Sequence, residues 1–239
     1  MNGYNQSPFA NITPVVKNLL IINILFFIGD ITIGKYFPKV MQVLPVYYFN
    51  SPFFRPWEII TYMFMHGGFA HIFFNMFALF SFGPILEYSM GQKKFFNLFF
   101  LCGIGGVLCN FAVQAYEVHA ITGAFTISHP ELQETFDQYH GAGEKLAAIY
   151  YGQTVGASGA IFGLLVAFGM MYPNLELMIM FIPVPIKAKY IIPVYIVIEL
   201  FLGYQQYSWD NTAHFAHLGG ALIGYLLVKI WKLQNSGNY

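Results

Sequence analysis

The sequence predicts an all-α membrane protein with six transmembrane helices, and two observations support this fold class. Hydrophobic residues make up 57% of the 239 residues and charged residues only 9%, whereas soluble domains carry about 25% charged residues. Four long stretches contain no Lys, Arg, Asp or Glu, namely 59–86, 95–116, 146–175 and 211–228. A membrane-spanning helix needs about 20 mostly apolar residues, so these stretches are predicted to cross the bilayer.

The six predicted spans cover residues 15–34, 58–82, 94–117, 155–172, 190–206 and 211–230. The first span lacks the basic segment and the Ala-x-Ala cleavage site of a signal peptide, so we expect a retained helix. Residues 118–154 are predicted to form a polar external loop with a short helix in part of it. The apolar stretch 175–184 is interrupted by prolines and could lengthen the fourth span, begin the fifth or lie at the interface. Without repeats, residues 1–239 are predicted to be a single domain.

The distribution of basic residues predicts the orientation in the membrane. With the N-terminus in the cytoplasm, seven basic residues lie inside and four outside, which agrees with the positive-inside rule. The inner residues are Lys17, Lys93, Lys94, Lys187, Lys189, Lys229 and Lys232, and the outer ones are Lys35, Lys39, Arg55 and Lys145. We therefore expect a multi-pass protein of the cell membrane with both termini in the cytoplasm. The formal net charge of zero offers no basic surface to nucleic acid.

Polar residues inside the predicted spans mark a candidate functional site, because such residues are costly in a bilayer. They are His66, His71 and Asn75 in the second span, Gly156, Ser158 and Gly159 in the fourth, and His214 and His217 in the sixth. His71 and Asn75 are four residues apart and therefore share one helix face. Together these residues predict a site formed by three different spans.

A serine nucleophile with a histidine base suits these groups best. A serine is a weak nucleophile until a base takes its proton, and histidine is the usual base because its pKa lies near working pH. The glycines beside Ser158 let a substrate backbone approach and leave amide groups available to an oxyanion. His71 and Asn75 would add side-chain donors. No buried Asp is predicted to complete a triad, so the predicted catalytic unit is a dyad.

Other interpretations of the same residues are weighed against this one. Small residues in membrane helices commonly mark close packing, and both Gly159-x-x-x-Gly163 and Gly220-x-x-x-Gly224 fit that description. A histidine alone could simply bond a neighbouring helix. Neither His-Glu-x-x-His nor His-x-x-Glu-His occurs, so no metal or other cofactor is predicted. A proton-relaying transporter is a further alternative, although internal repeats, which transporters often show, are not found.

Three motifs follow one another along the chain. They are His66-Gly-Gly-Phe-Ala-His71-Ile-Phe-Phe-Asn75 with Phe82-Gly83-Pro-Ile-Leu-Glu87, then Gly156-Ala-Ser158-Gly159, then Ala216-His217-Leu-Gly-Gly220-Ala-Leu-Ile-Gly224. In this order they resemble the rhomboid family of intramembrane serine proteases, over roughly residues 15–230. The resemblance implies a rhomboid-like bundle with a short, re-entrant-like catalytic fourth span. One departure lies in the first external loop, where many members have Trp-Arg and this chain has Trp57-Glu58.

The resemblance also implies roles for individual residues. Ser158 matches the nucleophile, and His217 matches the general base and acid because the family's glycine spacing follows it and does not follow His214. The further matches are His71 and Asn75 as oxyanion-stabilising residues, Gly156, Gly159 and Phe162 as supporting residues, and Glu87 as a structural acidic residue. His66 and His214 are interpreted as structural.

The sequence therefore predicts an intramembrane serine endopeptidase that cleaves transmembrane segments of membrane-protein substrates through an acyl-enzyme. Its expected partners are those substrates and the lipid bilayer, with no nucleic acid and no metal. Two alternatives stay open: a catalytically silent rhomboid-like protein that binds membrane clients, and a membrane transporter that uses its histidines.

Overall fold

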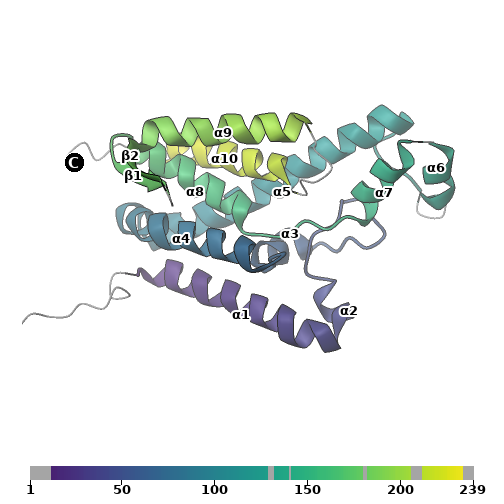
Figure 1. The fold of residues 1–239 in the computed structure, drawn as a ribbon, viewed down its shortest axis with the longest axis horizontal. Helices are drawn as coiled ribbons and strands as arrows, with labels where there is room; N and C mark the ends of the chain where they lie inside the picture. The colour runs from purple at the N-terminus through teal and green to yellow at the C-terminus, as the bar shows by residue number, and fades with distance from the viewer. Residues whose placement is uncertain (1–11, 129–131, 140, 180–181, 206–211, 234–239) are drawn as a thin grey trace, which may run out of the picture.

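The computed structural model describes residues 12–128, 132–139, 141–179, 182–205 and 212–233. These residues fold into a mostly helical bundle (Figure 1) whose main helices are α1 (Pro14–Tyr36), α4 (Phe69–Met90), α5 (Gln92–Thr122), α8 (Ser158–Met171), α9 (Ala188–Gln205) and α10 (His214–Ile230). By length and composition α1, α4, α5 and α9 can cross a membrane, whereas α8 and α10 are shorter apolar helices. The predicted helical membrane fold is confirmed, and the count of six spans remains a prediction.

The second predicted span differs most from the structure. The sequence predicts one helix over residues 58–82, but the chain forms α3 (Glu58–Thr61), a 3-10 turn (Tyr62–Phe64) and then α4, which begins only at Phe69 and continues to Met90. The adjacent Gly67 and Gly68 explain the interruption, because glycine is a poor helix former. His66 therefore lies before the helix, while His71 and Asn75 occupy its first two turns.

The other predicted spans agree with the structure within a few residues at most of their ends. The third is longer than predicted, because α5 continues to Thr122 instead of ending at residue 117. The fourth begins at Ser158 instead of residue 155. Residues 206 and 211, the predicted limits of the last two spans, lie outside the described residues.

The apolar stretch 175–184 belongs to an antiparallel hairpin of β1 (Glu176–Ile179) and β2 (Ile182–Lys187). The placements in the fourth and fifth spans are therefore wrong, and the fold is not purely helical, whereas a position at the membrane interface remains a prediction. Its prolines disfavour a helix because each removes a backbone donor. In a two-stranded sheet both strands are edges, where a proline can be accommodated. The hairpin lies at the end of the bundle opposite the segment between α5 and α8 (Figure 1).

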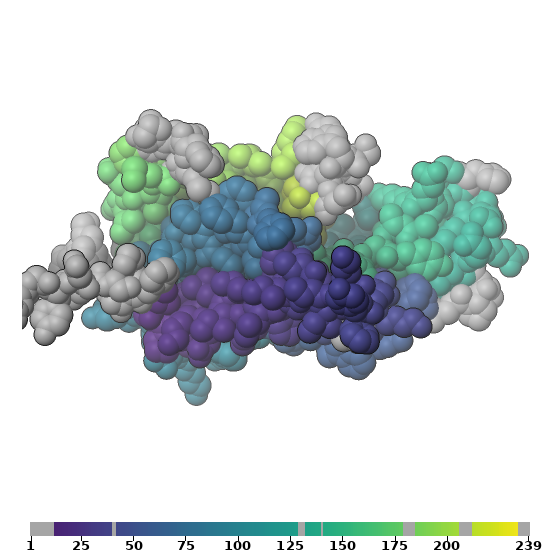
Figure 2. Space-filling view, turned by 60° about the horizontal axis from the view of Figure 1, so that its bottom comes forward, coloured from purple at the N-terminus to yellow at the C-terminus, as the bar shows by residue number. Residues whose placement is uncertain are grey.

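The predicted polar loop 118–154 contains two helices, α6 (Leu132–Gln138) and α7 (Gly143–Tyr151), which form one end of the molecule (Figures 1 and 2). This segment contacts the loop after α1. The Tyr48 hydroxyl donates to the Phe125 carbonyl at 2.9 Å, and the Tyr150 hydroxyl donates to Asn50 Oδ1 at 2.7 Å. The expected short helix is confirmed, and a second helix accompanies it.

The loop after α1 contains α2 (Pro38–Met41) and is anchored by the Trp57-Glu58 pair. Glu58 is fully buried and accepts a hydrogen bond from the Tyr47 amide at 3.2 Å. The Trp57 indole donates to the Val43 carbonyl at 2.8 Å. An isolated bridge between Val46 and Thr154 joins this loop to the residues just before Ser158, so the loop supports the strand-like segment that enters α8.

Glycines let α5, α8 and α10 approach one another closely. A Cβ atom at Gly220 would lie 1.9 Å from the Gly159 carbonyl oxygen, and one at Gly224 would lie 2.5 Å from that of Gly163. The prediction that these glycines mark helix packing is therefore confirmed. The close approach places the first turn of α10 beside the first turn of α8, which is where the candidate catalytic residues lie.

Glu87 binds the beginning of α1. Its carboxylate accepts hydrogen bonds from the Val15 and Val16 amides at 3.0 and 2.9 Å and from the Thr13 hydroxyl at 2.5 Å. A carboxylate at a helix N-terminus satisfies otherwise unpaired amides and opposes the positive end of the helix dipole. Glu87 thus has the structural position that the sequence predicted.

Candidate active site

The structure brings Ser158 and His217 together from two helices. Ser158 is the first residue of α8, and His217 lies in the first turn of α10. His217 Nε2 lies 2.7 Å from Ser158 Oγ, although the residues are 59 positions apart in the chain. This separation is within the 2.6–3.2 Å reach that proton transfer to a base requires. The His217 side chain is 10% exposed, so this histidine lies largely out of solvent.

Phe162 supports the imidazole of His217 from one side. It lies one turn after Ser158 on α8, and its ring stacks on the imidazole with centroids 4.4 Å apart and planes 8° from parallel. Stacking of this kind limits rotation of the imidazole. The position of Phe162 matches the supporting role predicted for it.

A cavity of about 740 Å³ opens in front of the pair. Its lining combines α4, α8 and α10 with the segment that precedes Ser158. Among the lining residues are Tyr62, His71, Asn75, Gln153, Gly156, Ser158, Phe162 and His217. All the residues predicted for the site therefore face, or lie beside, one cavity.

His71 and Asn75 offer donors to this cavity. His71 Nδ1 accepts a hydrogen bond from the Gly67 amide at 3.3 Å, so in the neutral ring Nε2 carries the proton. Asn75 is 5% exposed, and its buried Nδ2 has no hydrogen-bond partner among the described residues. Buried amide groups are almost always paired, so this free donor suits a negatively charged group that is bound only transiently.

Gly156 makes room for the His71 ring. A Cβ atom at this position would lie 2.6 Å from His71 Nε2, and the backbone has φ +122°, which favours glycine. The Gly156 amide donates to the Tyr62 carbonyl at 2.9 Å, which fixes the turn into α8. The first backbone amides of α8 have no hydrogen-bond acceptor within the helix, and they form the positive end of the helix dipole. A negative charge beside Ser158 would suit this end of the helix.

The sequence reasoning missed Glu199. This residue of α9 places its Oε2 atom 2.9 Å from His217 Nδ1 and 2.7 Å from His214 Nδ1. The sequence predicted that no buried Asp completes a triad, and it did not consider a largely enclosed glutamate for that place. The signal was present in the sequence, since Glu199 is an acidic residue in the middle of an otherwise apolar predicted span.

The two histidines predicted to be structural have different surroundings. His214 shares the Glu199 carboxylate with His217. His66 is 3% exposed, its ring lies edge-on 5.1 Å from that of His71, and neither of its ring nitrogens has a hydrogen-bond partner among the described residues.

One group of side chains has the composition of a metal site. The ligand atoms of Glu199, His214 and His217 all lie within 4.8 Å of one another. A carboxylate with two imidazoles is a donor set that zinc accepts. However, the same short contacts are those expected of a carboxylate that accepts two N–H groups, so the absence of a metal remains a prediction.

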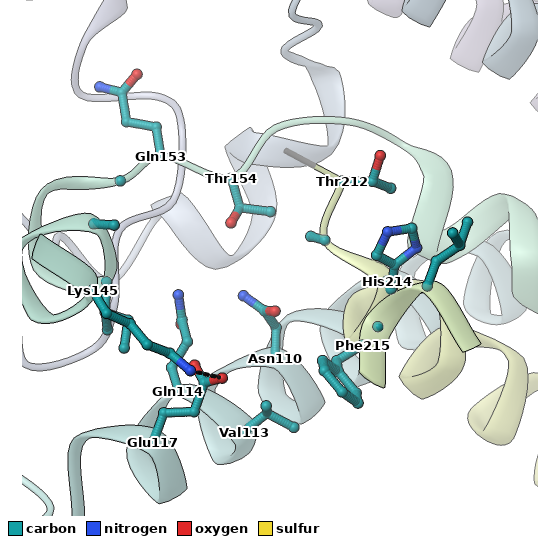
Figure 3. A pocket seen from close by; sticks show the side chains of 16 residues that line it. Asn110, Val113, Gln114, Glu117, Lys145, Gln153, Thr154, Thr212, His214 and Phe215 are labelled. Atoms are coloured by element: carbon teal, nitrogen blue, oxygen red, sulfur yellow. Dashed lines mark ion pairs between the residues drawn. The ribbon is translucent and has the colours of Figure 1, made fainter. Parts of the chain in front are cut away.

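A second cavity, of about 620 Å³, adjoins the first and is drawn in Figure 3. The two cavities share the lining residues Gln153, Thr154, Thr212 and Ala213. The second is lined by polar side chains of α5, including Asn110 and Gln114, and by His214. An ion pair of 3.0 Å between Lys145 and Glu117 crosses it (Figure 3). Ser158 and His217 thus line the first cavity, and His214 lines the second.

Comparison with known proteins agrees with this geometry. Residues 54–233 match the model of the Rhomboid domain. The chain is 30% identical over 176 residues to Rhomboid protein 1, mitochondrial, of Saccharomyces cerevisiae, which covers 71% of this chain and 40% of the relative. It is also 30% identical over 183 residues to RHOMBOID-like protein 5 of Arabidopsis thaliana, and this match covers 77% of this chain and 46% of the relative.

A bacterial relative is also similar. Rhomboid protease GluP of Bacillus subtilis is 27% identical over 183 residues, covering 77% of this chain and 27% of the relative. The chain spans less than half the length of each of these three relatives. Since the domain match includes α4 to α10 and therefore the whole candidate site, this chain belongs to the rhomboid family.

Proposed function

We propose that this protein is an intramembrane serine endopeptidase that cleaves transmembrane segments of other membrane proteins. The observation that carries the proposal is the 2.7 Å separation between Ser158 Oγ and His217 Nε2 at the wall of a cavity. The names of two relatives, Rhomboid protease GluP and Rhomboid-like protease 1 of Toxoplasma gondii, give protease as their activity. The proposed unit is one domain of six spans in the cell membrane, with both termini in the cytoplasm.

The reaction proceeds through an acyl-enzyme. His217 takes the Ser158 proton at Nε2 as Oγ attacks the scissile carbonyl carbon, and the carbonyl oxygen becomes an oxyanion. The amide at the start of α8, with His71 and Asn75, donates to that oxyanion. His217 then returns the proton to the leaving amine as the C–N bond breaks. A water molecule, deprotonated by the same Nε2, attacks the ester, and its proton returns to Ser158 Oγ as the carboxylic acid leaves.

The short fourth span supports a reaction within the membrane. Helix α8 has 14 residues and so extends roughly 21 Å at 1.5 Å per residue, which is less than the hydrocarbon thickness of about 30 Å. With its other end at the opposite surface, α8 would hold Ser158 below the bilayer surface, and the two cavities that share Gln153 and Thr154 would admit water. A substrate helix must unwind to expose its carbonyl, so weak helix formers such as Gly near the cleavage point ease cleavage.

The proposal is tested with purified protein in liposomes and a model substrate that has one transmembrane helix. We expect Ser158→Ala and His217→Ala each to reduce cleavage by at least about 1,000-fold, because serine and base act as one unit. His119→Ala is the matched control, since His119 lies exposed at the end of α5, and it should cleave like the wild type. Cleavage at the wild-type rate by Ser158→Ala would refute the proposal.

A further inference from the structure

Glu199 is an ionisable residue in an apolar helix that can cross the membrane. Its side chain is only 13% exposed. A carboxylate in such surroundings is costly unless hydrogen-bonded or paired. A carboxylate in the middle of α9 therefore needs hydrogen-bond or ion-pair partners.

Two histidines of α10 are the partners of Glu199. Oε2 lies 2.9 Å from His217 Nδ1 and 2.7 Å from His214 Nδ1, so both imidazoles point the same ring atom at one carboxylate oxygen. An ionised carboxylate only accepts hydrogen bonds, and each of its oxygens has two lone pairs. Both Nδ1 atoms are therefore the donors, and one oxygen accommodates both of them.

This arrangement determines the tautomer of His217. A neutral imidazole carries one ring proton, and the carboxylate holds that proton on Nδ1. The lone pair of Nε2 then faces Ser158 Oγ at 2.7 Å, as a general base requires. His214 donates to the same carboxylate oxygen and so helps to fix its position. The two imidazoles meet edge-on, with ring centroids 6.3 Å apart.

We propose that Glu199 is a positioning residue for catalysis: it holds His217 in the tautomer that accepts the Ser158 proton and stabilises the imidazolium that forms, while His214 holds Glu199. The inference rests on the proposed function and extends the predicted Ser–His dyad by two positioning residues, Glu199 beside His217 and His214 beside Glu199. The proton that leaves Ser158 stays on Nε2 of His217 and never transfers to Glu199. The charge of the carboxylate opposes the charge of the imidazolium.

The charged and titratable groups around Glu199 are few among the described residues. From α10 the facing groups are His214 and His217. Helix α8, which packs on α9, has no Asp, Glu, Lys, Arg or His. Strand β2 contributes Lys187, twelve positions before Glu199, which is about 18 Å along a helix. The two imidazoles are therefore the groups that respond to loss of the Glu199 charge.

The decisive variant is Glu199→Gln in the full chain, assayed with the single-span substrate. The amide keeps the shape but loses the charge, and its N–H₂ can face Nδ1 and favour the wrong tautomer. We expect kcat to fall by about 100- to 10,000-fold, the upper value being that of the corresponding Asp-to-Asn exchange in a serine-protease triad. KM should change little, because Glu199 does not line the front cavity. Glu176→Gln, an exposed acid of β1, is the control and should keep wild-type kcat.

The pH profile separates positioning from a merely structural role. Without the carboxylate the imidazolium loses its counter-charge, so the acid-side inflection of kcat/KM should move to lower pH in Glu199→Gln. A residue needed only for folding would change the amount of active enzyme and leave this inflection in place, and that result would overturn the proposal.

A second variant, Glu199→Asp, applies if Glu199→Gln does not fold. Aspartate keeps the negative charge but has a side chain one methylene shorter, so the carboxylate no longer reaches His217. A kcat at least 10-fold lower supports the proposal, and a wild-type kcat overturns it.

Ser158→Ala, assayed alongside, distinguishes the two proposals. An inactive Ser158→Ala beside a fully active Glu199→Gln overturns the role of Glu199 and leaves the protease proposal standing. A fully active Ser158→Ala overturns the protease proposal itself.

Discussion

The ring of Phe162 lies flat against the imidazole of His217, with centroids 4.4 Å apart and an angle of 8° between the planes. Ser158 meets the same imidazole at Nε2 and Glu199 meets it at Nδ1. The face and both nitrogens of the histidine are thus each constrained by a different side chain. Two of these side chains come from α8 and the third from α9.

Removing the stacked ring should loosen the imidazole without removing a reacting group. Such contacts are worth about 0.5–1.5 kcal/mol, so we expect Phe162→Ala to reduce kcat by roughly 2- to 13-fold. Phe162→Tyr keeps the ring and should stay within about 2-fold of the wild type. Steady-state cleavage rates give the comparison, and equal rates for Phe162→Ala and the wild type would contradict a supporting role.

The donors on α4 should affect the transition state more than substrate binding. Removal of one oxyanion donor typically costs about 100- to 1,000-fold in kcat, and we expect this range for Asn75→Ala and for His71→Ala. The Asn75 amide nitrogen has no other partner among the described residues, so its loss should hardly alter thermal stability. A normal kcat for Asn75→Ala, with folded protein, would exclude it from the oxyanion site.

Gly156 offers a steric test of the same site. In Gly156→Ala the new methyl group would lie 2.6 Å from His71 Nε2, so we expect His71 to be displaced and activity to fall at least 10-fold. Gly123→Ala is the matched control, because Gly123 also has a positive φ but a Cβ atom added there would have no neighbouring atom within 4 Å. It should lose about 1–2 kcal/mol of stability from backbone strain and keep its activity. Equal activities for the two variants would contradict the predicted clash.

Metal removal tests the alternative use of Glu199, His214 and His217. Because these side chains already satisfy one another by hydrogen bonding, we expect the cleavage rate to be unchanged after prolonged treatment with strong chelators. The measurement is the rate before and after dialysis against the chelator. Activity that disappears and returns on addition of zinc would show that the cluster is a metal site.

Part of the site could be predicted because the relevant residues lie close together in short motifs. Ser158 with its glycines, and His217 with Gly220 and Gly224, are recognised by their resemblance to rhomboid motifs, and close helix packing then places them together. The contact of Glu199 with His217 depends on how α9 and α10 face each other. The spacing of residues along the chain does not predict that contact. The sequence offered only the presence of an acidic residue in an apolar span as an indication that Glu199 has a function.

The errors in the fold have a similar physical origin. An uncharged stretch such as residues 59–86 is compatible with lipid and equally with the protein interior. Tyr62 and Met63, which precede α4, are buried in the core. Charge alone therefore could not locate the start of α4 at Phe69. The hairpin was missed because a short apolar run fits a strand as well as a helix.

The central claim is that His217 activates Ser158, and covalent labelling tests it most directly. The folded protein is treated with a fluorophosphonate probe, and the modified residue is identified by mass spectrometry of the digested protein. We predict one adduct on Ser158 in the wild type, with labelling lost in Ser158→Ala and at least about 100-fold slower in His217→Ala. An unlabelled wild type, or labelling of Ser158 that does not depend on His217, would contradict the claim.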